Sequence, residues 1–138
     1  MTIHIIGSSG FIGFHLASFL LSHDWKIIGL DAMTDYYDVE LKISRLNLLC
    51  ENPNFYNYEG LVQDTKLLNE ICLHHKPNIL VHLAAQAGVR YSIDNPLSYV
   101  ESNLIGTFHI LELAKQYKLD HLLMASTSSV YGSNKDIP

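Results

Sequence analysis

The sequence predicts an α/β protein built on a doubly wound parallel sheet. Five short apolar segments alternate with four longer segments in which apolar residues recur every three or four positions, the spacing of a helix with one buried face. Strands that alternate with helices favour a parallel sheet, with helices on both faces and right-handed crossovers. We therefore expect one domain over residues 1–138, with five strands in the order 3-2-1-4-5.

The first half of the chain begins with a short apolar run at residues 2–6, which ends at a glycine and predicts the first strand. Helical spacing of apolar residues follows over residues 11–23. Residues 26–30 predict the second strand, which Asp31 closes. Helical spacing returns over residues 39–50 and predicts the second helix.

The second half begins with a weak, aromatic third strand at residues 55–58. A helix is expected at residues 65–75, with Asp64 before it, where a carboxylate accepts a hydrogen bond from a free backbone N–H. The last two strands are expected at residues 78–82 and 121–125.

A longer helix is expected between these last two strands, at residues 96–117. Asn95 and Pro96 predict its cap and first residue, since proline is already set for the first helical position and needs no N–H there. Its apolar positions fall at spacings of three and four: Leu97, Val100, Leu104, Phe108, Leu111 and Ala114.

Composition and charge exclude several classes of protein. Hydrophobic residues make up 48% and charged residues 17% of the chain, which is typical of a globular domain. The net charge of -5 and the scattered Lys and Arg argue against nucleic-acid binding. The apolar runs are too short to span a membrane and the N-terminus lacks a secretory signal, so we expect a cytoplasmic protein. Cys50 and Cys72 are expected to be buried thiols, and no histidine pair has metal-binding spacing.

A glycine-rich loop, Gly7-Ser8-Ser9-Gly10-Phe11-Ile12-Gly13, joins the first strand to the first helix. One glycine makes the tight turn, one lets the backbone approach a pyrophosphate, and one lets the helix pack closely on the strand. The helix N-terminus then offers unpaired N–H groups and a partial positive charge to phosphates. This context predicts dinucleotide binding at five positions: Gly7, Gly10, Phe11, Ile12 and Gly13.

Asp31 ends the second strand 18 residues after Gly13. An acidic side chain at this position binds the ribose hydroxyls of a nicotinamide dinucleotide. A carboxylate there also repels a 2′-phosphate, so NAD is favoured over NADP. The alternative interpretation of Asp31 is a simple turn residue at a strand end.

The spacing of these glycines resembles the extended short-chain dehydrogenase/reductase family, whose loop reads GxxGFIG and whose fold is Rossmann-like. Three further stretches agree with the family's motifs: residues 82–92 (His-Leu-Ala-Ala-Gln-Ala-Gly-Val-Arg-Tyr-Ser), residues 101–107 (Glu-Ser-Asn-Leu-Ile-Gly-Thr) and residues 126–132 (Ser-Thr-Ser-Ser-Val-Tyr-Gly). The resemblance covers essentially the whole chain.

Within this family, the chain is most similar to the UDP-glucuronate 4-epimerases. The similarity lies in residues 35–38 (Asp-Tyr-Tyr-Asp), in the pairs 41–42 and 45–46, and in residues 87–92. A dTDP-glucose dehydratase is not favoured, because it would carry Asp-Glu where this chain has Ser128-Ser129. UDP-glucose 4-epimerase and UDP-glucuronate decarboxylase stay open.

The resemblance implies reversible oxidation at C4 of a UDP-sugar, with a hydride passing to NAD and returning to the other face. It implies Thr127 as a catalytic hydroxyl with Ser128 nearby. It implies a cofactor-binding set, Leu83, Ala84, Ala85 and Asn103, of which the asparagine supports the active site. It also implies a substrate-binding set, Ala87, Gly88, Val89 and Arg90. For Arg90, a surface salt bridge is an equally open interpretation.

The sequence departs from the family pattern at the catalytic Tyr-x-x-x-Lys pair. Tyr131 and Lys135 have this spacing, but residues 132–134 between them (Gly-Ser-Asn) favour a loop, whereas the family's pair lies on a long helix. We therefore expect residues 1–138 to form an incomplete NAD-binding domain, with the catalytic helix and the sugar-binding region absent and no turnover by this chain alone. A non-catalytic dinucleotide-binding module is the alternative.

Two smaller departures concern the cofactor. Leu61 follows Gly60, where family members carry an Asp that contacts adenine, and Ala32 follows Asp31, where the subgroup has Asn. Weaker cofactor binding is the expected consequence of the change at Leu61. The resemblance also implies a homodimer formed through the helix at residues 96–117.

Overall fold

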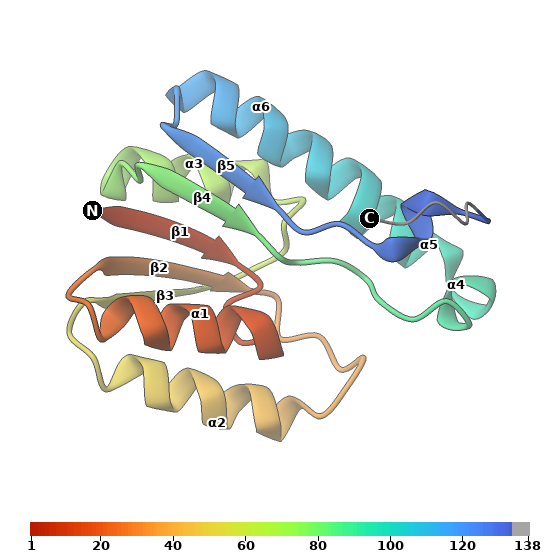
Figure 1. The fold of residues 1–138 in the computed structure, drawn as a ribbon, viewed down its shortest axis with the longest axis horizontal. Helices are drawn as coiled ribbons and strands as arrows, with labels where there is room; N and C mark the ends of the chain where they lie inside the picture. The colour runs from red at the N-terminus through yellow and green to blue at the C-terminus, as the bar shows by residue number, and fades with distance from the viewer. Residues whose placement is uncertain (134–138) are drawn as a thin grey trace.

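The computed structural model describes residues 1–133, and its five strands form one parallel sheet in the order β3-β2-β1-β4-β5 (Figure 1). This is the order that the sequence predicts. The strands are β1 (Thr2–Ile6), β2 (Lys26–Asp31), β3 (Phe55–Glu59), β4 (Ile79–His82) and β5 (His121–Met124). The helices are α1 (Phe11–Leu21), α2 (Val39–Cys50), α3 (Thr65–His75), α4 (Tyr91–Asp94), α5 (Pro96–Tyr99) and α6 (Thr107–Tyr117).

Helices cover both faces of the sheet, with α1 and α2 on one side and α3 and α6 on the other (Figure 1). Successive residues of a strand point to opposite faces, and β1 follows this rule. Ile3 and Ile5 pack into the core that contains Ala17 of α1. Ile6 packs into the core that contains Ile71 of α3 and Ile110 of α6. The central strands are therefore mostly apolar on both faces, as expected for a parallel sheet, with His4 of β1 and His82 of β4 as buried polar exceptions.

Asp64 caps α3 as predicted, since the backbone N–H of Leu67 donates to Asp64 Oδ1 at 3.0 Å. Asp38 caps α2 in the same way, accepting from the N–H groups of Glu40 and Leu41. These caps fix where each helix begins, and with them the loops that precede the helices.

The long helix has the predicted extent but is not uniform. Pro96 begins it, and α5 continues through a π-helical stretch, η1 (Val100–Gly106), into α6. Asn95 is the N-cap and Pro96 the first helical residue, as predicted, but the Asn95 side chain makes no cap hydrogen bond. Its amide Nδ2 instead donates to the Tyr91 hydroxyl at 3.0 Å, because the unpredicted short helix α4 ends directly before it.

Three further details correct the sequence prediction. Helix α1 ends at Leu21, two residues early, because Asp24 adopts a left-handed backbone conformation in the turn before β2. Cys50 is exposed, because it is the last residue of α2, whereas Cys72 is buried as predicted. Strands β2 and β3 each extend one residue further than predicted, while β4 begins one residue later and β5 ends one residue earlier.

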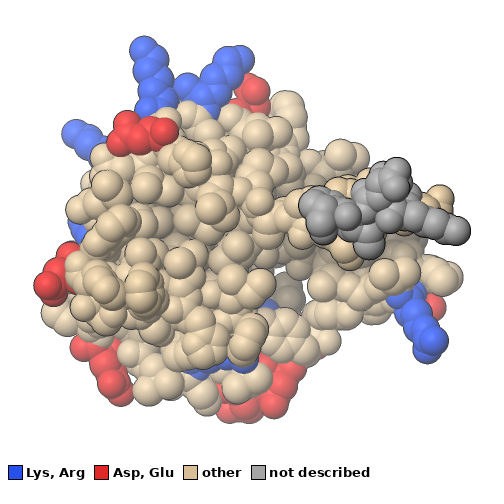
Figure 2. Space-filling view, viewed as in Figure 1, with Lys and Arg blue, Asp and Glu red and all other residues tan. Residues whose placement is uncertain are grey.

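Charged side chains of both signs lie around the edge of the face shown in Figure 2, and its centre carries neither sign. Among the described residues, no helix has both the length and the apolar character that a membrane crossing requires. Within the same range, no group of three or more His, Cys, Asp or Glu side chains gathers in a way that could hold a metal ion.

Candidate cofactor site

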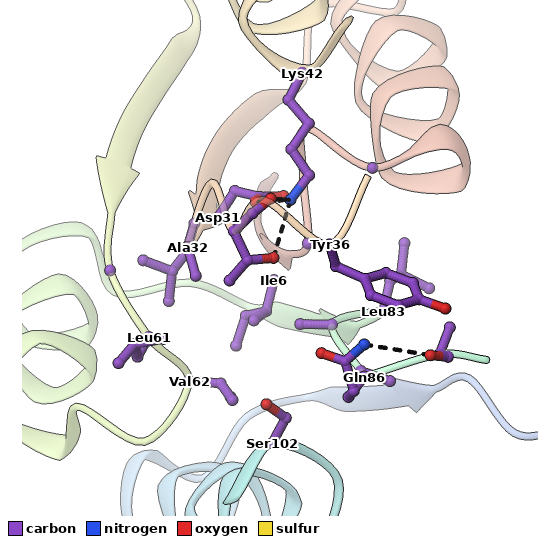
Figure 3. A pocket seen from close by; sticks show the side chains of 18 of the residues that line it. Ile6, Asp31, Ala32, Tyr36, Lys42, Leu61, Val62, Leu83, Gln86 and Ser102 are labelled. Carbon is purple, nitrogen blue, oxygen red and sulfur yellow. Dashed lines mark hydrogen bonds and ion pairs between the residues drawn. The ribbon is translucent and has the colours of Figure 1, made fainter. Parts of the chain in front are cut away.

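A cavity of about 230 Å³ opens at the carboxyl ends of the central strands (Figure 3). From β1 the sheet continues to β2 and β3 on one side and to β4 and β5 on the other, so the strand order reverses at this point. Ligands of doubly wound sheets bind at such a switch point. The walls come from the loops after four strands and include Gly7, Gly10, Asp31, Tyr36, Leu61, Ala84 and Gln86.

The glycine loop has a geometry that only small residues allow. Gly7 has φ +91°, and a Cβ there would stand 2.9 Å from the Ala84 nitrogen. A Cβ on Gly13 would collide with the Gly7 carbonyl oxygen, so glycine is needed for α1 to lie this close to β1. Gly10 occupies the N-cap of α1 and, because it has no side chain, leaves the first N–H groups of the helix without a side-chain cap. The first turn of α1, with Phe11 and Ile12 exposed, therefore keeps backbone N–H groups available for an anion.

Asp31 is buried at the end of β2 and lines the cavity. Its Oδ2 accepts from the Ser9 backbone N–H at 3.0 Å, and its Oδ1 accepts from the Met33 N–H at 3.0 Å. The side chain thus ties the glycine loop to the strand end, which gives it a structural role beside the predicted one.

Lys42 of α2 reaches the same carboxylate, a contact that sequence reasoning missed (Figure 3). Its Nζ lies 3.5 Å from Asp31 Oδ1 and donates to the Thr34 carbonyl at 3.1 Å and the Thr34 hydroxyl at 3.4 Å. The Tyr37 ring lies 4.8 Å from the ammonium group. Burial raises the pKa of Tyr37, and the negative charge of Asp31 adds to this. The only signal in the sequence was that Lys42 follows a subgroup motif.

The segment after β4 forms the opposite wall, where Leu83, Ala84 and Ala85 line the cavity. The resemblance implied these three as cofactor-binding residues. Asn103, in the π-helical stretch, holds this segment from behind. The Gln86 N–H donates to Asn103 Oδ1 at 2.7 Å, and Asn103 Nδ2 donates to the Gln86 carbonyl at 2.9 Å. Both ends of the amide are thereby used, so Asn103 positions the wall without lining the cavity.

The predicted substrate residues lie at the mouth. Ala87 lines the cavity, while Gly88, Val89 and Arg90 are exposed, Val89 to 82%. Arg90 forms no ion pair with any residue in 1–133, so the surface salt bridge considered from the sequence is not observed there. Its charge is free to face an anion.

Thr127 and Ser128 follow β5 at the same edge of the sheet but do not line the cavity. Both are exposed, and Thr127 caps the short helix η2 (Ser128–Tyr131) by accepting from the Ser129 N–H at 3.3 Å. Lys135, the lysine of the rejected Tyr-x-x-x-Lys pair, lies outside the described residues. Leu61 lines the cavity and is 52% exposed, which leaves an apolar side chain where the family carries Asp.

A protein-family comparison matches residues 5–138 to the family described as GDP-mannose 4,6 dehydratase. The chain belongs to this family. Its motifs had placed it among the nucleotide-sugar epimerases of the extended short-chain dehydrogenase/reductases, and named relatives confirm this. It is 46% identical over 134 residues to a probable UDP-glucuronate 4-epimerase of Rhizobium meliloti (strain 1021), covering 97% of this chain and 39% of that protein. It is 42% identical to a UDP-glucuronate 4-epimerase of Thermodesulfobacterium geofontis, covering 92% and 39%.

Solved structures of nucleotide-sugar 4-epimerases also resemble this chain. The UDP-glucuronic acid 4-epimerase of Bacillus cereus, in complex with UDP-glucuronic acid and NAD, superposes with a TM-score of 0.89 at 32% identity, covering 100% of this chain and 44% of that one. UDP-glucose 4-epimerase of Thermotoga maritima with UDP-glucose gives a TM-score of 0.83 at 30% identity, covering 99% and 41%. The chain spans about two-fifths of the length of the curated relatives it matches.

Proposed function

We propose that this chain forms the NAD-binding part of a nucleotide-sugar 4-epimerase that interconverts UDP-glucuronate and UDP-galacturonate. The observation that carries the proposal is the likeness of this chain, over all of its own length, to 44% of the Bacillus cereus enzyme, which was solved with UDP-glucuronic acid and NAD. The likeness to a UDP-glucose 4-epimerase makes UDP-glucose the second candidate substrate.

The residues at the switch point fit a dinucleotide. The cradle has no room for a Cβ at Gly7 or Gly13, and the absence of a side chain at Gly10 leaves the N-terminus of α1 open to a pyrophosphate. Asp31, which accepts from Ser9 and Met33 and pairs with Lys42, keeps an acceptor site on Oδ2 for a ribose hydroxyl. Leu61 lines the cavity on the adenine side. The backbone of Leu83, Ala84 and Ala85 lies on the nicotinamide side.

When bound, NAD accepts a hydride from C4 of the sugar and returns it. Residues of this chain bind and orient the sugar for that step. Thr127 orients the substrate hydroxyl, with Ser128 beside it, and Arg90 faces the anionic substrate near Ala87, Gly88 and Val89. We assign the tyrosine that exchanges the proton, and its lysine, to a part of the enzyme outside residues 1–138. Turnover by this chain alone is therefore not expected.

An exposed apolar stripe supports the proposed homodimer through residues 96–117. Six residues of this helix have exposed apolar side chains: Leu97, Val100, Leu104, Ile105, Phe108 and Leu111. Monomeric proteins seldom leave such a stripe open to water.

Calorimetric titration of the 138-residue chain with NAD tests the proposal. We expect saturable binding that Asp31→Ala weakens by at least tenfold, since a hydrogen bond to a charged group contributes about 1.5–3 kcal/mol. Asp120→Ala removes an exposed carboxylate just before β5, at the opposite edge of the sheet, and should leave affinity unchanged. Absence of binding by the folded chain, judged by its far-UV circular dichroism, would contradict the proposal. Binding without turnover by any longer form of the protein would favour a non-catalytic module.

A further inference from the structure

The loop between β2 and α2, residues 32–38, contains the Asp-Tyr-Tyr-Asp motif, for which the proposed function gives no role. This loop is fixed at both ends. Met33, in a left-handed conformation at φ +50°, donates its N–H to Asp31 Oδ1 at 3.0 Å. Asp38 accepts from the Glu40 N–H at 3.0 Å and begins α2. The side chains between these anchors are therefore held in place at the cavity mouth.

Tyr36 extends from this loop over the cavity, toward the segment that carries Gln86 (Figure 3). Its ring packs on the Tyr91 ring with centroids 4.9 Å apart at an interplanar angle of 50°. Its hydroxyl stands where a Cβ on Gly88 would lie. Gly88 has φ +95°, so the loop turns sharply at the point of contact. The two contacts join the loop after β2 (residues 32–38) to the segment after β4 (residues 83–90). We call these two segments the lips of the cavity.

The lip after β4 is in turn attached to the long helix. The Tyr99 hydroxyl donates to the Ala87 carbonyl at 2.7 Å and also contacts the Gly88 carbonyl. The Tyr91 and Tyr99 rings lie 6.4 Å apart. Tyr36, Tyr91 and Tyr99 thus form a row that runs from the loop after β2 to helix α5.

We propose that Tyr36 is a clasp that closes the two lips over the cofactor, slows exchange of NAD with solvent, and positions residues 87–90 for the substrate. A dinucleotide at the switch point lies between these lips, so it is released only when the contacts of Tyr36 open. An epimerase returns the hydride within each cycle and gains nothing from cofactor exchange. The inference rests on the proposed function, because it assumes that the cavity holds NAD.

Exchange kinetics of NADH on the 138-residue chain test the clasp. NADH fluorescence reports binding on mixing, and an excess of NAD⁺ reports release. Because the clasp closes both the free and the loaded cavity, Tyr36→Ala should raise the association and dissociation rates together, each by roughly the tenfold that an aromatic contact corresponds to. The Kd should change by less than about threefold, since opening affects both rates alike.

The variants separate the clasp from other roles. Tyr36→Phe keeps the ring on Tyr91 and should retain most of the slow exchange. Tyr91→Ala should match Tyr36→Ala, and the double variant should be no faster than either single one, because both remove the same contact. Tyr56→Ala is the matched control, since Tyr56 is 39% exposed, as Tyr36 is, but lies on β3.

Each outcome is decisive. Faster exchange in both directions with a nearly unchanged Kd supports the clasp. Exchange in Tyr36→Ala that equals that of Tyr56→Ala overturns the clasp and leaves the proposed function standing. A weaker Kd with an unchanged association rate makes Tyr36 a simple contact and also overturns it. No binding by the unmodified chain overturns the proposed function, and the clasp with it.

Discussion

His4 offers a sharp test of how this sheet is held together. It lies in the middle of the central strand β1, opposite Ile28 of β2 and Leu80 of β4, and it is 0% exposed. Neither ring nitrogen has a hydrogen-bond partner among the described residues. Burial lowers the pKa of His4 to about 3, and His75 adds to this. The ring is therefore neutral in the folded chain, with one donor and one acceptor left unpaired.

Replacing His4 by leucine should stabilise the fold. An unpaired buried polar group costs about 1–3 kcal/mol, and leucine fills a similar volume without polar atoms, a kind of swap whose packing cost stays below about 1.5 kcal/mol. We expect His4→Leu to raise the free energy of unfolding at pH 7 by up to about 3 kcal/mol less this packing cost, measured by urea denaturation. His121→Leu, an exposed position on β5, should give no comparable gain.

The pH dependence gives a second, independent signature. Between about pH 6.5 and 3 the unfolded histidine binds a proton that the folded one does not, so stability falls as the pH falls, by up to about 1.4 kcal/mol per pH unit for this group. Burial lowers the pKa values of His75 and His82 as well, and they contribute with the same sign. His4→Leu should remove one proton from this slope. An unchanged slope, or a less stable variant, would refute the argument.

Three further changes probe the walls of the site. Asn103→Ala removes both hydrogen bonds to Gln86 and should speed hydrogen exchange at the Gln86 amide about tenfold or more, with weaker NAD binding by calorimetry. Lys42→Met leaves the Asp31 carboxylate buried without its cation and should lower the free energy of unfolding by about 3–5 kcal/mol in urea; adding Asp31→Asn should recover much of the loss. Leu61→Asp restores the family's residue at the proposed adenine position and should tighten NAD binding about tenfold by calorimetry, whereas an unchanged Kd would contradict this use of the resemblance.

Much of the fold was predictable because it depends on local patterns. Apolar periodicity located all five strands and the four main helices, and their alternation gave the sheet order. The glycine loop and the Asp64 cap were predictable for the same reason, since each depends on residues only a few positions apart.

What the sequence did not predict depends on side chains that meet across loops. Lys42 reaches Asp31 from the next helix, and Tyr36 reaches Gly88 from 52 residues away, so no local pattern signals either contact. The widening of the long helix around Asn103 is likewise absent from its regular apolar spacing. Such contacts depend on the final packing of elements, which periodicity does not specify.

The Asp31–Lys42 pair also bears on the choice between NAD and NADP. A lysine beside the ribose position would ordinarily attract a 2′-phosphate. Here its three donors already face Asp31 and the two oxygens of Thr34, and its side chain is buried. The ribose would therefore meet the carboxylate and not the ammonium group, which keeps NAD favoured.

Asp31→Asn removes the negative charge and leaves the positive charge of Lys42 uncompensated beside the ribose position. We expect it to shift the ratio of the NADP Kd to the NAD Kd toward NADP by at least tenfold, measured by calorimetry of both ligands. An unchanged ratio would mean that shape, and not the charge of Asp31, sets the preference.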